Sequence, residues 1–405
     1  MRLVFNSPFP AQYEAQLAAD ARIVDLNYSY LDTPPGEELA LAFAAIPSRI
    51  TILDLSFNNL GRRADLPIAL KAIPRNINSL CLASNNLGIL TGEQLASSFR
   101  AISVCVRTLN LNSNILGILE PSVLIQACSA IPLGVTVLEL RANMLNRRNG
   151  KELASAFATL QANINTLYLD DNGLGKLPGA DLKRTFAAIP GTVTELNLSN
   201  NNFDIRTGPD LELAFSGIRT SVVSLDLSKN SLGELKSSAL RQVLKAIHPR
   251  LTSLNLSSNN LAKQPIVELR SAFAAIPAGV TTLKLANNEL NKLSPSALAL
   301  VLSSIPAGVT SIDLNGNNLD LITEAEWARI IDKLPKNVTS ILSDGLSQSK
   351  ISKIMQQVRR AALFVPVLAE AAPISAFDTY SFWTAKDKQL SKEVLPAAAS
   401  IIAAL

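Results

Sequence analysis

Few side chains in this sequence have the types that catalysis requires. The chain contains one histidine, His248, and three cysteines, Cys81, Cys105 and Cys128. A Ser-His-Asp or Cys-His site would need His248 as its base, and no nucleophile with matching geometry can be proposed for it. The histidine and cysteines also lack the number and spacing of metal ligands. We therefore expect no catalytic residues, no metal site and no cofactor, and we interpret His248 as a loop residue.

Two arginine pairs leave one catalytic alternative open. Arg62-Arg63 and Arg147-Arg148 lie in expected strand-to-helix loops, where a GTPase activator would carry an inserted arginine. Charged loop residues are usually only solvated. Cys81 is expected on an accessible surface, but without a basic neighbour its thiolate fraction should be small. The leading hypothesis is a non-enzymatic protein, and GTPase activation is the alternative.

The dominant feature of the sequence is a pattern that returns every 29 residues. Each turn reads L-x-x-L-x-L-x-x-N-x-L and continues into a stretch with helical periodicity, such as 238–247. A period of this size indicates a solenoid of stacked repeats. One central leucine-type residue per turn keeps this spacing, with a single interval of 27: Val24, Leu53, Leu80, Leu109, Leu138, Leu167, Leu196, Leu225, Leu254, Leu283, Ile312 and Ile341.

The pattern within one turn predicts an α/β fold. Alternating apolar residues predict a short strand, and the stretch with period 3.6 predicts a helix. Parallel strands lie about 4.8 Å apart while packed helices need about 8–10 Å, so the strands must line the inside of a curve. We expect a curved horseshoe, with a parallel β-sheet on the concave face and helices on the convex face.

The repeat also suggests a domain organisation. We expect an N-terminal cap at 1–20, a solenoid at 21–346 with about 11 full turns and a degenerate last turn, and a helical C-terminal cap and tail at 347–405. A capping box at Thr323 and Glu326 predicts a helix in the last turn. Beyond it, four residues share one helical face and predict a lid over the exposed core: Ile351, Met355, Val358 and Ala362.

Ten consecutive turns carry asparagine at the same position. An inward-pointing amide can satisfy backbone groups where each strand ends, including those of the next repeat. We therefore interpret these residues as structural: Asn58, Asn85, Asn114, Asn143, Asn172, Asn201, Asn230, Asn259, Asn288 and Asn317.

The strand motif resembles the leucine-rich-repeat superfamily, and the 29-residue period with a full helix per turn resembles its ribonuclease-inhibitor-like class. The amino-acid sequence of the turns, as in the segment 273–290 (FAAIPAGVTTLKLANNEL), is similar to that of leucine-rich-repeat effectors of intracellular bacteria of the Legionella type. The resemblance implies protein binding through the concave face and type IV secretion of a virulence effector into a host cell. Unlike ribonuclease inhibitors, this chain is basic and poor in cysteine. It also lacks the appended catalytic domain of bacterial leucine-rich-repeat ubiquitin ligases.

Charge and composition narrow the partners and the compartment. The net charge of +4 is too mild to indicate nucleic acid, because the expected strands carry few basic residues. An uninterrupted apolar signal segment is missing from 1–17, and Pro366, Glu370 and Pro373 interrupt the apolar tail, so we expect no membrane span. Cysteines without a disulfide pattern indicate a reducing compartment. We expect a monomer that is cytosolic when folded and reaches the host cell without a Sec signal.

The outward strand positions suggest where a partner binds. In the later turns they are mostly Ser, Thr, Asn and Asp, whereas earlier and middle turns carry aromatic and charged residues. Aromatic and arginine anchors bordered by charge are typical of binding hot spots. A cap over Tyr28 and a scaffold without a single partner stay as alternatives. The candidate residues for binding a host or bacterial protein are Tyr28, Phe57, Glu139, Arg141, Tyr168, Asp170, Asp171 and Glu195.

Overall fold

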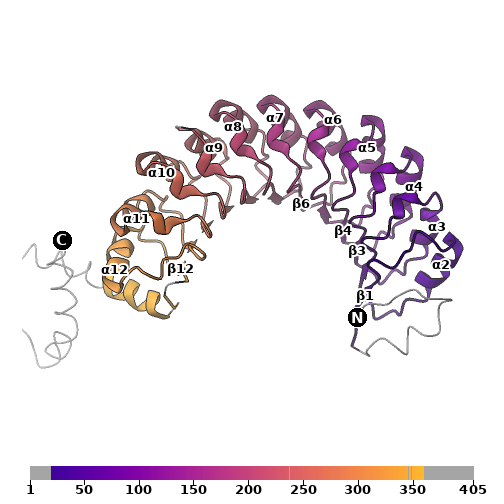
Figure 1. Cartoon of the computed structure of the whole chain (residues 1–405), viewed down its shortest axis with the longest axis horizontal. Coiled ribbons are helices and arrows are strands. Elements are labelled where there is room, and N and C mark those ends of the chain that lie inside the picture. The colour runs from indigo at the N-terminus through magenta and orange to yellow at the C-terminus, as the bar shows by residue number, and fades with distance from the viewer. Residues whose placement is uncertain (1–19, 237, 345, 348, 360–405) are drawn as a thin grey trace, which may run out of the picture.

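The computed structural model describes residues 20–359 except 237, 345 and 348. Over this range strands and helices alternate along a curved arc (Figure 1). The strands line the inner edge of the arc and the helices its outer edge. The predicted solenoid, with its sheet on the concave face and its helices on the convex face, is therefore confirmed.

Twelve parallel strands form one sheet, and their order in the sheet is their order in the sequence. Each strand pairs with the next so that the central leucines are direct partners, as Leu196 is with Leu225. All twelve are centred on the residues that the repeat predicted: β1 (Ile23–Asp25), β2 (Ile52–Asp54), β3 (Ser79–Cys81), β4 (Thr108–Asn110), β5 (Val137–Glu139), β6 (Thr166–Tyr168), β7 (Glu195–Asn197), β8 (Ser224–Asp226), β9 (Ser253–Asn255), β10 (Thr282–Lys284), β11 (Ser311–Asp313) and β12 (Ser340–Leu342).

One α-helix per repeat covers the outer face, because its apolar side chains pack against those of the sheet. The capping box of Thr323 and Glu326 is present at the start of α12, as expected. The helices are α2 (Gly36–Ala44), α3 (Leu66–Lys71), α4 (Gly92–Ala101), α5 (Pro121–Ser129), α6 (Gly150–Phe157), α7 (Gly179–Ala187), α8 (Gly208–Phe215), α9 (Ala239–Ala246), α10 (Ile266–Phe273), α11 (Pro295–Leu302) and α12 (Glu324–Lys333).

A short 3₁₀ turn, which the repeat pattern did not predict, lies between strand and helix. It is preceded by residues in the left-handed conformation, such as Asn200 (φ 53°) and Asn202 (φ 58°). Asparagine and glycine tolerate this conformation better than bulky residues do. The turns are η1 (Leu60–Arg62), η2 (Leu87–Ile89), η3 (Leu116–Ile118), η4 (Leu145–Arg147), η5 (Leu174–Lys176), η6 (Phe203–Ile205), η7 (Leu232–Glu234), η8 (Leu261–Lys263) and η9 (Leu290–Lys292).

A single apolar core runs between the sheet and the helices along the whole arc. Phe215 contacts Phe186 of the preceding helix and Phe203 of the neighbouring 3₁₀ turn, with ring centroids 6.2 and 5.3 Å apart. Cys128 occupies the equivalent of Phe215 in its own repeat and is buried, as the register predicted. Each repeat thus shares its core with its neighbours, which is how a solenoid is stabilised.

The two ends of the chain are described only in part. Residues 349–359 are helical, and Ile351, Met355 and Val358 are buried in the common core. Ala362, the tail from 360 onward and residues 1–19 of the expected N-terminal cap lie outside the described residues. The division into 1–20, 21–346 and 347–405 therefore stays a prediction.

The ten repeated asparagines form a continuous buried ladder. The Asn201 side-chain oxygen accepts hydrogen bonds from the backbone N–H groups of Asn172 and Leu174 in the preceding repeat, both at 3.1 Å. Its Nδ2 donates to the carbonyl oxygens of Leu169 and Leu198, also at 3.1 Å. One amide therefore satisfies backbone groups of two successive repeats, as the sequence predicted.

We predict that Asn201→Leu destabilises the solenoid by about 1–3 kcal/mol, because the backbone groups that the amide satisfies stay buried without partners. Urea or thermal unfolding followed by circular dichroism measures this change. Asn78→Leu is the matched control, since Asn78 is exposed on the side of the sheet. Equal stability of the wild type and Asn201→Leu would show that the ladder does not carry this free energy.

Candidate partner-binding site

Most repeats place an Asp or Asn directly after the central leucine of the strand, and we call this the Asx position. Its side-chain oxygen accepts a hydrogen bond from the backbone N–H two residues later, as Asp226 does from Ser228 at 2.8 Å. These polar residues of the concave face therefore stabilise the strand end. The same bond is made by Asp25, Asp54, Asn110, Asn197, Asn255 and Asp313.

Two adjacent strands depart from this rule. Glu139 of β5 and Tyr168 of β6 occupy the Asx position and are direct partners in the sheet. Three other residues depart from it singly. Cys81 lies between Asp54 and Asn110, Lys284 lies between Asn255 and Asp313, and Leu342 lies next to Asp313 at the end of the sheet. The scaffold is satisfied by Asp or Asn at this position. The replacement of that residue in two adjacent strands, by Glu139 and Tyr168, is therefore not explained by the fold.

Hydrogen bonds hold the residues around Glu139 in place. Asn112 of the preceding repeat donates from Nδ2 to Glu139 at 2.9 Å and accepts from the backbone N–H of Arg141 at 2.7 Å. Arg141 Nε lies 3.3 Å from Asp170, and its Nη2 lies 3.8 Å from Asp171. The Arg141 side chain is still 55% exposed, so one part of its guanidinium group is fixed and the rest faces solvent.

Tyr168 lies among carboxylates. Burial raises the pKa of its hydroxyl, and nearby Glu139, Glu195 and Asp170 raise it further. Glu195 is the sheet partner of Thr166, two residues before Tyr168. The hydroxyl therefore stays protonated and can donate a hydrogen bond.

Burial also raises the pKa of Glu139 and Asp170. The hydrogen bond from Asn112 opposes the shift at Glu139, and the charge of Arg141 opposes it at Asp170. An additional cation nearby stabilises the charged form of a partly desolvated carboxylate. A positively charged side chain therefore suits this group of residues. We call the group the acidic–aromatic patch, and its members are Glu139, Arg141, Tyr168, Asp170, Asp171 and Glu195.

Tyr28 and Phe57, which the sequence grouped with these residues, form a separate cluster. Their rings stack with centroids 4.4 Å apart and an interplanar angle of 14°. Together with Tyr30 and Asp32 they line a shallow hollow of about 320 Å³. Strands β3 and β4 lie between this hollow and β5, which at about 4.8 Å per strand separates the two clusters by roughly 14 Å.

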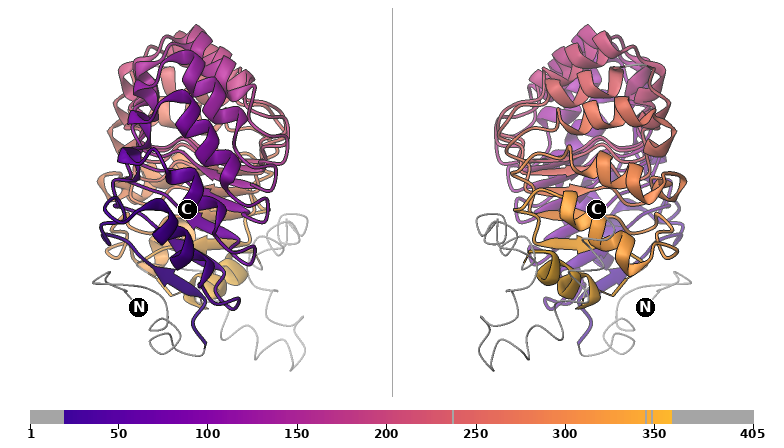
Figure 2. Two further views of the ribbon diagram at one scale, coloured as in Figure 1. Left: turned by 90° about the vertical axis from the view of Figure 1, so that its right-hand side faces the viewer. Right: turned by 90° about the vertical axis from the view of Figure 1, so that its left-hand side faces the viewer.

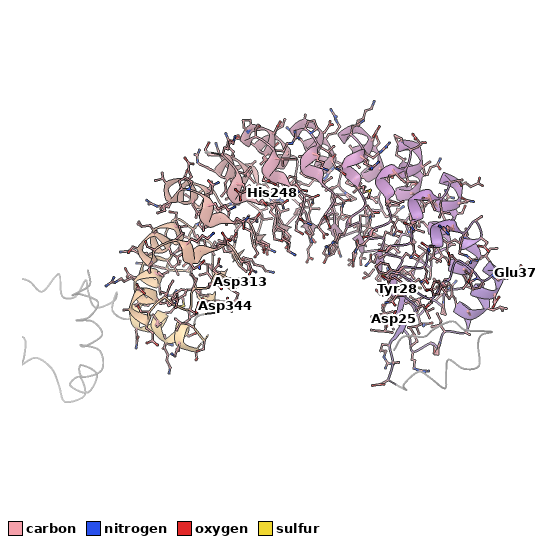
Figure 3. All side chains as sticks on the ribbon, in the orientation of Figure 1. Asp25, Tyr28, Glu37, His248, Asp313 and Asp344 are labelled. Carbon is pink, nitrogen blue, oxygen red and sulfur yellow. The ribbon has the colours of Figure 1, made fainter. Side chains whose placement is uncertain are left out.

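The concave face as a whole is acidic although the chain carries a net charge of +4. Figure 3 shows Asp25, Asp313 and Asp344 at the inner edge of the arc and Glu37 at its outer edge. At the outward strand positions of the described residues, only Arg141 and Lys284 are basic. The carboxylates at these positions are Asp25, Asp54, Glu139, Asp170, Glu195, Asp226, Asp313 and Asp344.

Sequence reasoning missed two contributors to the patch. Asn112 joins Glu139 to Arg141, and the charge of Asp226 raises the pKa of both Tyr168 and Asp170. Both residues looked like ordinary polar strand residues. The sequence signal that could have located the patch is the replacement of Asp or Asn at the Asx position in two neighbouring repeats, which is visible when the turns are aligned.

The possible catalytic side chains are placed unfavourably for chemistry. His248 lies between α9 and β9, in the body of the arc (Figure 3), and burial lowers the pKa of its ring. Burial raises the pKa of the Cys81 thiol to about 12, which suppresses its thiolate as predicted. Among residues 20–359 that are described, no group of three or more His, Cys, Asp or Glu side chains could hold a metal ion.

The arginine pairs divide into scaffold and solvent-facing members. The buried Arg63 guanidinium donates to the carbonyl oxygens of Leu31 at 2.8 Å and Pro34 at 2.6 Å, and to Asp65 at 2.8 Å. In the second pair, Arg148 donates to the carbonyl oxygen of Gly117 at 3.0 Å. These two arginines hold neighbouring repeats together. Their partners Arg62 and Arg147 are exposed.

The repeated strand, 3₁₀ turn and helix, tied by an asparagine ladder, define a leucine-rich-repeat protein. Residues 250–272 match the Leucine Rich Repeat family. The structure is similar to that of the leucine-rich repeat-containing protein LegL7 from Legionella pneumophila, with a TM-score of 0.63, 28% identity, and coverage of 83% of this chain and 97% of that one.

A chain from the Rad7–Elc1 complex of yeast matches less closely, with a TM-score of 0.41, 15% identity, and coverage of 74% of this chain and 78% of that chain. A comparison with curated proteins finds no match. Within the part of the chain that the structure describes, none of the helices is long and apolar enough to cross a bilayer.

We predict that Glu139→Gln stabilises the protein at neutral pH. Because the pKa of Glu139 is raised on folding, the folded state binds more protons than the unfolded state at pH values between the ordinary and the raised pKa. The stability of the wild type therefore falls as the pH rises through this range. The gain should disappear below the ordinary glutamate pKa of about 4.3, where the carboxyl group is protonated in both states. Unfolding curves across this range test the sign, with Glu37→Gln on the outer face as control. A gain that grows as the pH falls would contradict it.

We further predict that Arg63→Ala destabilises the protein by about 1–3 kcal/mol, because two carbonyl oxygens and Asp65 lose a buried donor. Arg62→Ala, its neighbour and matched control, should change stability by less than about 0.5 kcal/mol, since its side chain is exposed. Thermal unfolding of the two variants separates a scaffold arginine from a solvent-facing one. Similar melting curves for both would contradict the assignment.

Proposed function

We propose that this leucine-rich-repeat protein is a non-enzymatic module that binds another protein through the acidic–aromatic patch of its concave face. The observation that carries the proposal is the replacement of the Asx residue by Glu139 and Tyr168 in two adjacent repeats. Neither side chain makes the strand-end hydrogen bond of the Asx position, and Asn112 of the preceding repeat accepts from the backbone N–H of Arg141 instead. Their neighbours include Asp170, whose carboxylate is partly desolvated. Such a cost is expected where binding restores the lost free energy.

The chemistry of the patch favours a basic partner segment. A Lys or Arg side chain placed between Glu139 and Glu195 would pair with their carboxylates and contact the Tyr168 ring, which adds a cation–π interaction. The exposed part of Arg141 offers a donor to an acidic or carbonyl group of the same partner. The acidic residues that extend along the concave face would speed the approach of such a partner at low salt.

We also propose that the protein is a bacterial effector that acts in a host cell and is cytosolic when folded. The structural similarity to a Legionella pneumophila protein over 83% of the chain supports this assignment. Its target is then a host or bacterial protein. The Tyr28–Phe57 hollow is a secondary contact for that target.

The GTPase-activator alternative is restricted by the arginine contacts. Arg63 and Arg148 are bonded to the preceding repeat, so only Arg62 and Arg147 are open to a nucleotide. A scaffold without a specific partner would not require the paired departure at Glu139 and Tyr168. The binding module therefore accounts for more of the observed geometry than either alternative.

We predict that Tyr168→Ala or Arg141→Ala weakens partner binding by roughly thirtyfold, the loss that corresponds to a hot-spot contact of about 2 kcal/mol. Affinity capture with the wild-type chain from host-cell and bacterial lysates supplies the partner, and calorimetry on the purified pair measures the effect. Ser253→Ala in β9 is the control and should cost less than about 0.5 kcal/mol. The nearby Asn255 of β9 cannot serve as a second control, because its side chain accepts a hydrogen bond from the backbone N–H of Ser257 and donates one to Asp226.

Loss of binding in Ser253→Ala with full binding in Tyr168→Ala and Arg141→Ala would place the interface in the C-terminal half. Phe57→Ala reports separately on the hollow, since β3 and β4 separate it from the patch.

A further inference from the structure

A second surface follows the last residue of each 3₁₀ turn along one side of the arc. This position is exposed in every repeat from η1 to η9 and in the equivalent turn at Leu321. Basic residues occupy half of the repeats: Arg62, Arg147, Lys176, Lys263 and Lys292. Aliphatic residues occupy most of the others: Ile89, Ile118, Ile205 and Leu321. Glu234 is the exception, and we call this row the basic–apolar edge.

The fold does not require aliphatic residues along the edge. Ile89 is 53% exposed, Ile205 52% and Leu321 87%, while equivalent turns place Lys at the same position. Since the fold accepts a charged side chain there, packing does not require isoleucine. Exposure of these side chains is unfavourable in water, which points to a role outside the isolated chain.

Two neighbouring residues reinforce the apolar character at η3 and η4. Ile115 and Met144 precede these turns in the left-handed conformation, with φ of 54° and 57°. Equivalent positions carry Asn202 or Gly173, which adopt that conformation at lower cost. A β-branched residue such as Ile115 is strained there, so the local backbone conformation does not favour its apolar side chain.

Close stacking of the turns brings these side chains into one strip. A Cβ atom added to Gly117 would lie only 2.0 Å from the carbonyl oxygen of Met144, and one added to Gly88 would lie 2.6 Å from that of Ile115. Gly88 and Gly117 therefore allow close contact with the following turn, whereas η4, η6, η8 and η9 carry Asn146, Asp204, Ala262 and Asn291 at the same position. Ile89, Ile118 and Met144 consequently project from adjacent, tightly stacked turns.

The charge of the edge is opposite to that of the concave face. Lys263 pairs with Glu234, and Lys292 pairs with Glu289 at 2.7 Å. For Arg62, Arg147 and Lys176, no ion pair occurs with any other residue that the structure describes. The edge therefore offers uncompensated cations between exposed aliphatic side chains.

The shape of the arc lets the whole edge meet a flat surface. Seen end-on, the two arms of the arc lie one behind the other (Figure 2), so equivalent turns follow one side of the molecule. The aliphatic residues are spread from η2 to Leu321. A protein hot spot would instead require them to gather in one central pocket. An anionic bilayer accepts dispersed contacts of this kind, with aliphatic side chains at the headgroup boundary and cations on lipid phosphates.

We propose that the basic–apolar edge docks the protein peripherally on an anionic membrane surface. This orientation leaves the concave face open, because the strands and the 3₁₀ turns belong to different sides of each repeat. The proposal does not depend on the acidic–aromatic patch. It assigns a membrane-facing role to Arg62 and Arg147, which the alternative of GTPase activation would have used differently.

Co-sedimentation of the full chain with phosphatidylcholine vesicles, with and without phosphatidylserine, tests the proposal. We expect salt-sensitive binding only when phosphatidylserine is present. Arg147→Glu/Lys176→Glu should lower the partition coefficient by about 25-fold or more, since each cation near an anionic surface contributes about fivefold. Ile89→Ser/Ile118→Ser should weaken the binding that remains at high salt.

Matched controls carry the same changes on the outer helices. Lys183→Glu/Arg241→Glu alters net charge equally at exposed positions of α7 and α9, and Leu41→Ser/Leu300→Ser removes exposed leucines of α2 and α11. These variants should bind vesicles like the wild type, as should Tyr168→Ala. Melting curves verify that each variant is folded.

Failure of the wild-type chain to sediment with phosphatidylserine vesicles would overturn the proposal and favour an acidic protein on this edge. Equal losses in the edge variants and the outer-helix controls would also overturn it, because binding would then follow net charge alone.

Discussion

The buried asparagine ladder is the interaction on which the rest of the structure depends. Each amide satisfies backbone groups in its own repeat and in the one before it, so consecutive repeats can stack only in register. Because an unsatisfied backbone group in the core is costly, the ladder fixes the spacing of all strand ends. Every other position of the repeat then forms a row along the arc, and the rows define the faces of the protein.

Residues that the scaffold does not need can differ from repeat to repeat, and this freedom separates structure from function. The Asx position shows the contrast well, because Asp226 stabilises its strand end whereas Tyr168 in the equivalent place does not. Arg63 and Arg148 show the converse, since charged residues that suggested chemistry form bonds between repeats. Identity of residue type is therefore a poor guide to role until the contacts are known.

The geometry of the repeat gives the concave face and the edge a different balance of charge. The strands present carboxylates such as Glu139 and Glu195 to the concave side, while the 3₁₀ turns present Arg147 and Lys176 along the edge. A net charge of +4 conceals this division. Two surfaces of unlike chemistry on one rigid arc would allow the protein to hold two partners at once, a basic protein and an anionic surface.

The sequence by itself determined the strand register, the asparagine ladder and the concave position of the sheet, because the central apolar residue recurs in twelve turns and the asparagine in ten. Only the tertiary structure decided which side chains meet across repeats. The separation of Phe57 from Tyr168, the bridge that Asn112 makes to Arg141 and the burial of Arg63 all depend on how closely successive repeats stack. Such contacts join residues about one repeat apart, and their strength varies with distances and desolvation that a residue pattern does not contain.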